Sequence, residues 1–192
     1  MSKIILASSS PYRKALLERL NVEFTCQSPD LDEDSYKQRI SDPVKLAETL
    51  AFEKANAIFK PNPDSIVIGS DQLVDFEGEI LGKAGDLDRA FNQLKRLSGK
   101  SHRLITSFCV LSNDNSYTKT VKTTLTMRKL KNEQIKKYLR FDNPIDCAGS
   151  YKLELKGISL FDKIETDDHT AIVGLPLLSL GTYLSSIGIP IP

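Results

Sequence analysis

The start of the chain changes from a strand pattern to a helical pattern through a run of hydroxyl residues, and this constrains the fold most. Residues 4–6 are apolar and suit a short buried strand. Ser10 has the chemistry of a helix N-cap, with Pro11 at the first helical position, where its missing N–H costs nothing. The free N–H groups of a helix start, together with Arg13, suit an anion. A capped surface helix with an incidental arginine explains the local pattern equally well.

A second apolar run, residues 65–70, predicts a strand buried on both faces, as in the centre of a layered α/β sheet. Asp71 follows it and would lie at its carboxyl end. Ligands of open α/β sheets bind at the carboxyl ends of strands, and the Ser8–Ser10 turn also follows such an end. We therefore expect both to face one crevice. The alternative is that Asp71 is a plain turn residue.

Lys54 falls in the middle of an apolar helical stripe. Residues 43–59 have a helical pattern that Ser41 or Asp42 opens. One narrow face of this helix carries Ala47, Leu50, Ala51 and Ile58. A lysine on a core-facing side either extends its ammonium to solvent or points it into a site. The small alanines leave room for a pocket and favour the second interpretation.

An acidic stretch at residues 30–34 follows a predicted strand at residues 22–26. Such stretches are usually solvated loops. Glu33 gains a role only if this loop folds back over the Ser8–Ser10 turn, where a carboxylate could help to hold a divalent ion.

The remaining patterns complete one α/β unit, with two lobes as an option. They predict a hairpin at 73–76 and 79–81, helices at 86–97 and 132–140, strands at 104–111, 120–127, 158–164 and 171–173, and a last helix from 174. The segment Gly78–Ala84 is not a P-loop, because its glycines are wrongly spaced and Ala84 stands where a Ser or Thr would bind Mg²⁺.

The composition excludes several classes of protein. Lys+Arg 26 against Asp+Glu 25 leaves a net charge of +1, which gives no field for a polyanion. The three cysteines lie far apart and indicate neither a disulfide framework nor a zinc site. The sequence shows no signal-peptide pattern and no long apolar span. We therefore expect a reduced, cytoplasmic protein without a nucleic-acid or membrane partner, and a homodimer is compatible with this expectation.

Several short stretches, in order and over essentially the whole chain, resemble the Maf (septum formation inhibitor) family. They are residues 6–13 (LASSSPYR), 54–55 (KA), 69–72 (GSDQ), 82–83 (GK), 97–100 (LSGK), 148–151 (AGSY) and 173–177 (VGLPL). The resemblance implies a single domain over residues 1–192, with a two-lobed α/β fold, an elongated mixed central sheet flanked by helices, and a deep cleft. It also implies a nucleoside triphosphate pyrophosphatase that releases a nucleoside monophosphate and pyrophosphate with a divalent metal, Mg²⁺ or Mn²⁺.

The resemblance also assigns roles to individual residues. Asp71 is the general base. The triphosphate is held by Ser8, Arg13, Lys54 and Lys83. Asp71 also binds the metal, and Glu33 is assigned to the metal or to the attacking water. A carboxylate among cations should titrate low, so we expect Asp71 to act as a base mainly by position, with the metal offsetting its weak basicity.

The branch of the family is indicated by Tyr12, Gln72 and Glu154. The branch acting on dTTP and UTP carries Arg, Thr and Gln there, whereas the branch acting on 7-methyl-GTP carries an aromatic residue, Gln and Glu. An aromatic face suits the positive charge of a 7-methylated guanine, and an ionised Glu accepts from the guanine N–H groups. We therefore expect a 7-methyl-GTP pyrophosphatase that removes modified nucleotides. The alternatives are a dTTP/UTP pyrophosphatase and a non-catalytic nucleotide-sensing regulator of cell division.

The sequence departs from the common family pattern at two positions. Many members carry a second arginine in place of Tyr12, and a proline in place of Ala84. The first difference bears on the choice of substrate, and the second on the stiffness of a loop. Glu154 as a surface strand residue and Tyr12 as a packing residue are the structural alternatives to a role in base recognition.

Overall fold

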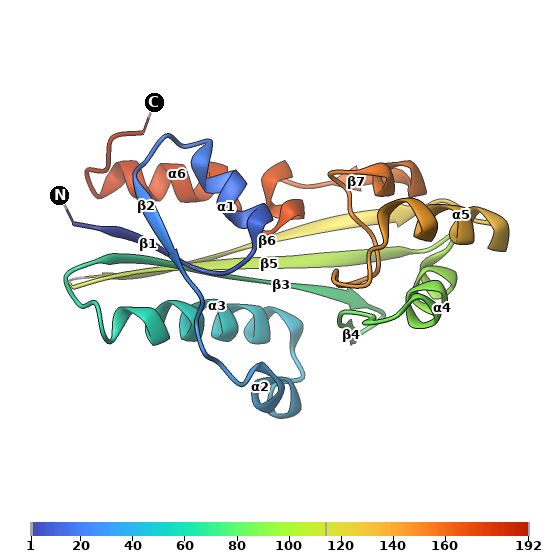
Figure 1. The fold of residues 1–192 in the computed structure, drawn as a ribbon, viewed down its shortest axis with the longest axis horizontal. Coiled ribbons are helices and arrows are strands. Elements are labelled where there is room, and N and C mark those ends of the chain that lie inside the picture. Colours follow the sequence, from blue (N-terminus) through green and yellow to red (C-terminus); the bar gives the residue numbers. More distant parts are fainter. Residues whose placement is uncertain (1, 114, 192) are drawn as a thin grey trace. The chain divides into compact units, whose positions relative to one another are not determined.

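The computed structural model describes residues 2–113 and 115–191. It contains a seven-stranded sheet in the order β2-β1-β3-β5-β6-β7, with β4 paired to β3 (Figure 1). The strands are β1 (Ile4–Ala7), β2 (Phe24–Gln27), β3 (Ile66–Phe76), β4 (Glu79–Leu81), β5 (Ser101–Ser112), β6 (Asn115–Met127) and β7 (Phe161–Glu165). Because β1 pairs in parallel with β2 and β3 while β4 and β7 pair antiparallel, the sheet is mixed, as predicted.

The α-helices are α1 (Pro11–Glu18), α2 (Glu33–Arg39), α3 (Pro43–Phe59), α4 (Leu87–Leu97), α5 (Asn132–Asp142) and α6 (Leu177–Ser186). Two 3₁₀ helices are η1 (Lys156–Leu160) and η2 (His169–Val173). The helix predicted at residues 43–59 is confirmed at both ends, with Asp42 as its N-cap. No helix among the described residues is both long and apolar enough to cross a membrane.

The chain divides into two compact units, which are described separately. The first unit consists of Met1–Gln72, Thr106–Val121 and Asp168–Pro192. Alternate residues of β1 pack against opposite faces: Ile4 and Leu6 share a core with α1 and α6, whereas Ile5 and Ala7 share one with α3. Figure 1 shows these helices on the two sides of β1 and β3. The unit is therefore a sheet covered by helices on both faces.

Gly69 allows α3 to lie very close to β3. A Cβ added to Gly69 would lie 2.2 Å from the carbonyl oxygen of Ala51 and 2.6 Å from the backbone nitrogen of Ala55. These two alanines are fully buried. Only a glycine opposite small residues permits this spacing, and it fixes the position of α3 over the strand.

The second unit consists of Leu73–Ile105 and Lys122–Asp167. Its helices α4 and α5 lie against each other, and α5 also contacts η1 (Figure 1). The β3–β4 hairpin turns at Glu77 and Gly78, as the sequence predicted, and both residues have positive φ. This unit contains Lys83 and Glu154.

Four local predictions are wrong. Residues 33–39 form α2 rather than a loop, because Asp32 caps them and charged pairs stabilise them although none of them is buried. The strand predicted to end near Ser70 continues to Phe76, so Asp71 lies inside β3 rather than at its end. The strand predicted at 158–164 begins only at Phe161, because residues 158–160 belong to η1, and the strand predicted at 171–173 is part of η2.

Candidate active site

Lys54 binds two carboxylates in the first unit. Its Nζ lies 2.6 Å from Oδ1 of Asp71 and 2.8 Å from Oε1 of Glu33. Lys54 is 8% exposed and Asp71 is 5% exposed. A buried lysine that extends toward two carboxylates confirms that the side chain points inward and does not extend to solvent.

The packing of α3 on β3 explains how Lys54 reaches Asp71. Ala51 and Ala55 contact Gly69, and Lys54 lies beside them on the same helix. Gly69 and Asp71 are two residues apart in a strand and therefore face the same side. The close approach at Gly69 thus brings the ammonium group of Lys54 within hydrogen-bond distance of the Asp71 carboxylate.

The Asp71 carboxylate has unusual electrostatics. Burial raises its pKa above the ordinary value, and the positive charges of Lys54 and Arg13 oppose this effect without overcoming it. The expectation that Asp71 titrates low is therefore wrong, because loss of solvation outweighs its cations. Its Oδ2 atom is buried and has no hydrogen-bond partner among the described residues. Asp71 is thus more basic than an exposed aspartate, and only one of its two carboxylate oxygens has a hydrogen-bond partner among the described residues.

The turn between β1 and α1 has the predicted N-cap, Ser10, and a further hydrogen bond at Ser8. Ala7 pairs with Gly69, so the turn begins beside the part of β3 that leads to Asp71. The Ser8 hydroxyl oxygen accepts a hydrogen bond from the backbone nitrogen of Ser10 at 3.1 Å. The Ser10 hydroxyl oxygen accepts from the backbone nitrogen of Arg13 at 3.4 Å. Ser8 is buried, and its hydroxyl group shapes the turn that leads into α1.

Arg13 is held by the loop that follows η2. Its Nε donates to the carbonyl oxygen of Gly174 at 3.0 Å. Ser70 Oγ donates to the same oxygen at 2.8 Å. Gly174 has a φ of 109°, and a Cβ there would lie 3.2 Å from Nε of Arg13, so glycine suits both the backbone and the contact. Burial lowers the pKa of Arg13, whereas Asp71 and Glu33 raise it.

Gln72 faces η2. Its amide nitrogen lies 2.8 Å from the carbonyl oxygen of Ala171 and 3.0 Å from that of Ile172. Thr106 donates to the Ala171 oxygen as well, at 2.9 Å. Ser70, Thr106 and Gly174 were not predicted to take part in the site. The polar residues inside the buried run of β3 were the available indication, because a polar group there needs a partner.

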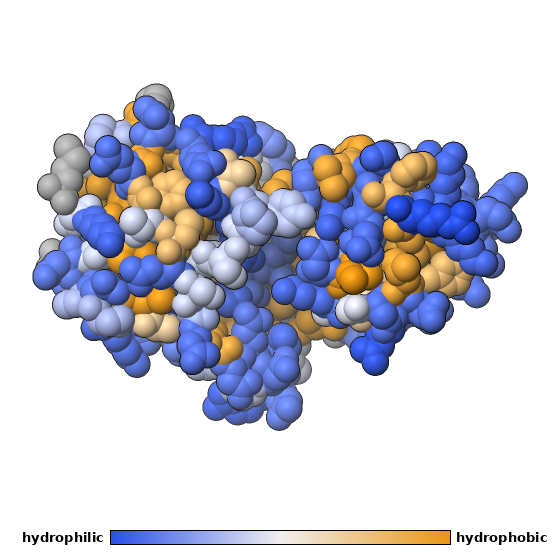
Figure 2. Space-filling view, viewed as in Figure 1, coloured by the Kyte–Doolittle hydropathy of each residue, from blue (hydrophilic) through white to orange (hydrophobic). Residues whose placement is uncertain are grey.

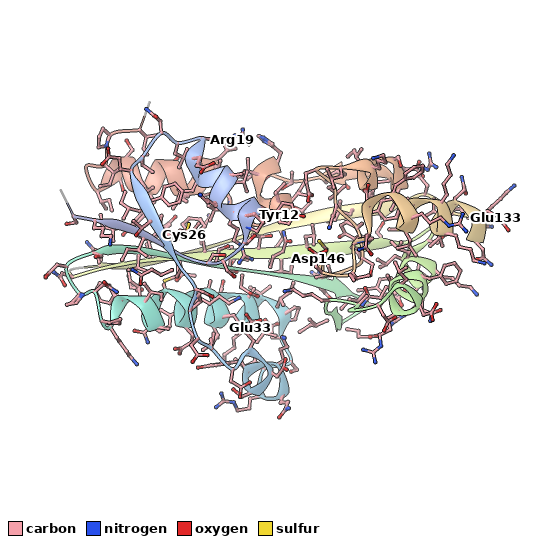
Figure 3. The ribbon with its side chains drawn as sticks, viewed as in Figure 1. Tyr12, Arg19, Cys26, Glu33, Glu133 and Asp146 are labelled. Atoms are coloured by element: carbon pink, nitrogen blue, oxygen red, sulfur yellow. The ribbon has the colours of Figure 1, made fainter. Side chains whose placement is uncertain are left out.

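Tyr12 and Glu33 come from the starts of α1 and α2 (Figure 3). Tyr12 is half-buried in the first turn of α1. Hydrophilic residues cover α2, the helix that begins at Glu33 (Figure 2). The described residues contain no group of three or more His, Cys, Asp or Glu side chains arranged for a metal. Any metal would therefore need further ligands from a substrate or from water.

Lys83 and Glu154 belong to the second unit, and both are exposed. Lys83 forms an isolated antiparallel bridge with Ala148. Glu154 lies in a turn before η1 and not in a strand. The first unit therefore brings together Arg13, Glu33, Lys54 and Asp71, whereas Lys83 and Glu154 are fixed within a different set of contacts.

Comparison with known proteins shows which family this chain belongs to. A family model described as Maf-like protein matches residues 3–187. A 7-methyl-GTP pyrophosphatase of Bdellovibrio bacteriovorus is 49% identical over 184 residues, covering 96% of each chain. Proteins of the same name from Bordetella pertussis and Alcanivorax borkumensis are 44% and 39% identical, covering 97% and 98% of this chain and 93% and 96% of their own. The chain therefore belongs to the Maf-like protein family.

Proposed function

We propose that this protein hydrolyses 7-methyl-GTP to 7-methyl-GMP and pyrophosphate, and so removes a modified nucleotide. The observation that carries the proposal is the buried Asp71 carboxylate, with one oxygen on Lys54 and the other without a partner among the described residues. The names and nearly full-length similarity of the relatives support the substrate. Cytoplasmic location and a small-molecule substrate, with no nucleic acid or membrane, are part of this proposal.

Asp71 takes the role of general base. In the reaction, water attacks the α-phosphorus, its proton passes to the carboxylate, and pyrophosphate leaves. A base works best when its pKa is near the working pH, and burial moves the pKa of Asp71 in that direction. Lys54 donates to Oδ1 and so holds the carboxylate in place for the proton transfer.

Four residues are proposed to hold the triphosphate: Ser8, Arg13, Lys54 and Lys83. The cations among them stabilise the negative charge that develops on the phosphate oxygens and on the leaving pyrophosphate. Arg13 enters with a fixed orientation, since its Nε is bonded to Gly174 and its guanidinium is directed by that bond. Lys54 donates a hydrogen bond to Asp71 and also stabilises the negative charge of the phosphate.

Asp71 and Glu33 are proposed to hold a divalent cation, Mg²⁺ or Mn²⁺. The fit rests on the partnerless Oδ2 atom of Asp71, because carboxylate oxygens are the ligands that these hard cations prefer. Such a cation, when bound, would polarise the phosphate and neutralise part of its charge. Two protein carboxylates suffice for Mg²⁺ when the phosphate and water supply the other ligands.

Tyr12, Gln72 and Glu154 are proposed to recognise the base. The Tyr12 ring offers an aromatic face to the positively charged 7-methylguanine. Glu154 accepts from the N1–H and N2–H₂ groups of guanine. Gln72 is held through its amide nitrogen, so its amide oxygen remains to accept a hydrogen bond.

The test is pyrophosphate release from 7-methyl-GTP, GTP, dTTP and UTP, with Mg²⁺ or Mn²⁺, compared as kcat/KM. We expect a clear preference for 7-methyl-GTP. A preference for dTTP or UTP would replace the proposal with the dTTP/UTP pyrophosphatase. Nucleotide binding without turnover of any of the four would instead favour the nucleotide-sensing regulator.

A further inference from the structure

Lys83 lies in a segment with little regular structure to fix it. It follows β4, is exposed, and forms a single isolated bridge with Ala148. The two paired segments, residues 82–85 and 145–150, have one further backbone link on one side of this bridge, where the nitrogen of Gly85 donates to the oxygen of Ile145 at 2.9 Å. An isolated pair of this kind needs additional support to hold a side chain in one place.

Gln93 supplies a link on the other side of the bridge. Its Nε2 donates to the carbonyl oxygen of Gly82 at 3.1 Å, and its Oε1 accepts from the hydroxyl of Ser150 at 2.6 Å. One side chain of α4 thus joins both segments. We call Gln93, Gly82 and Ser150, with the two hydrogen bonds between them, the Gln93 link. The amide donates to one partner and accepts from the other, whereas an ionised glutamate of similar size could not donate and a lysine could not accept.

The backbone at Ser150 shows why this support matters. Gly149 and Ser150 both have positive φ, 74° and 60°. A serine rarely adopts this conformation, and it persists where surrounding contacts determine it. The Ser150 side chain is fully buried, and its hydroxyl donates to Gln93. The Gln93 link therefore stabilises the turn that carries Ala148, the partner of Lys83.

Glu154 is anchored by different contacts. The backbone nitrogen of Lys152 donates to the Tyr138 hydroxyl at 2.9 Å, and that of Gly157 donates to Oδ2 of Asp142 at 3.0 Å. Both acceptors belong to α5, whereas Gln93 belongs to α4. The loss of the Gln93 link should therefore disturb Lys83 more than Glu154.

We infer that Gln93 is a positioning residue for Lys83. It acts through the backbone of Gly82 on one side and through the Ser150 turn on the other. This inference rests on the proposed role of Lys83 in binding the triphosphate. It adds a residue outside the substrate contacts whose loss should weaken phosphate binding without changing the choice of base.

The kinetic test uses the full chain with Gln93→Leu, Lys83→Ala and the double variant. Gln93→Leu should lower kcat/KM about tenfold, and by the same factor for 7-methyl-GTP and GTP. In the Lys83→Ala background the same change should have no further effect, because residues that act through one another are not additive. Asn92→Leu, at an exposed neighbouring position on α4, is the matched control and should keep wild-type kinetics. Unchanged kinetics in Gln93→Leu, or a loss that adds fully to that of Lys83→Ala, would overturn the inference.

A second measurement separates this inference from the proposed function. Amide hydrogen exchange without nucleotide should become faster in residues 81–86 and 145–151 of Gln93→Leu, while α5 stays protected. An inactive wild-type protein would refute the proposed function, and the exchange result would then decide whether Gln93 fixes these segments. Unchanged exchange in both segments would show that it does not.

Discussion

The two units hold their proposed site residues in opposite ways. In the first, Lys54 and Asp71 lie on a long helix and a central strand and are nearly buried. In the second, Lys83 and Glu154 are exposed and lie in short connecting segments. The charges of the first unit therefore affect folding stability as well as chemistry. Those of the second can be changed with little effect on stability, so paired variants can separate the two effects.

The largest expected effect is that of Asp71→Asn. Removal of the base should lower kcat about 10²- to 10⁴-fold. Because burial raises the pKa of Asp71, ionisation of this group opposes folding, so a neutral amide should not lower the free energy of unfolding at pH 7. Lys54 also keeps its ion pair with Glu33. Kinetics and urea denaturation measure both quantities.

The control for this variant is Asp75→Asn, on the same strand. Asp75 is buried in the second unit, pairs with Arg103 and accepts from the backbone nitrogen of Gly78. Its amide variant should lower stability but keep turnover. A fully active Asp71→Asn protein would return Asp71 to a structural role.

The next effect compares Lys54→Met with Lys83→Met. Each variant should lose about 10²-fold in kcat/KM, because each removes a cation from the triphosphate. Lys54→Met should also destabilise the protein by about 3 kcal/mol, since it removes the cation from the buried Asp71 carboxylate. Lys83→Met should change stability by less than about 0.5 kcal/mol. If urea denaturation showed equal losses of stability for Lys54→Met and Lys83→Met, the proposed difference between the buried and the exposed lysine would be wrong.

A smaller effect concerns His102 in the second unit. Its Nε2 lies 2.8 Å from the Tyr151 hydroxyl, and burial lowers its pKa from 6.5 to about 4. Between these values the unfolded chain binds a proton that the folded chain does not, so stability falls as the pH falls. The free energy of unfolding should fall by about 2 kcal/mol from pH 7 to pH 5 because of His102. The raised pKa of Asp71 acts in the opposite direction.

Urea denaturation at pH 7 and pH 5 checks the role of His102. From pH 7 to pH 5, the free energy of unfolding of His102→Asn should fall by about 2 kcal/mol less than that of the wild type. His169→Asn is the matched control, because His169 is the second histidine and is exposed. An equal dependence on pH in wild type and His102→Asn would assign the acid sensitivity to other groups.

The smallest effect is that of Glu154→Gln on the choice of base. The ratio of kcat/KM for 7-methyl-GTP over GTP should fall about tenfold or less, since Gln both donates and accepts where Glu only accepts. Stability should not change, because Glu154 is exposed. Glu133→Gln in the first turn of α5 is a control of equal charge change (Figure 3). An unchanged ratio would leave Glu154 as a surface residue.

Strong periodic patterns and caps allowed much of the fold to be predicted. The helix at residues 43–59, the Ser10 cap and the β3–β4 hairpin follow from local chemistry that the structure retains. The inward direction of Lys54 was predictable for the same reason, since its helical stripe is apolar. α2 escaped prediction because a short helix that buries none of its residues has no apolar period to detect.

Long-range partners explain the other errors. The polar residues after Gly69 look like the end of a strand, but their partners come from other segments: Lys54 for Asp71, and η2 for Gln72. Those bonds satisfy the buried polar groups and let β3 continue. Gln93 gave a weak indication, because it lies three residues after the buried Ala90 and four before the buried Leu97. Its partners at positions 82 and 150 could not be identified from a single sequence.

Gly69 has a consequence for attempts to redesign this protein. Even a methyl group there would collide with the backbone of α3. A single substitution at Gly69 therefore cannot adjust the spacing between α3 and β3. A mutant library that varies residues 51, 55 or 69 should therefore consist mostly of inactive clones. Library mutations are better placed in the exposed segments around residues 83 and 154, where the substrate range can be altered without disturbing the packing of α3 on β3.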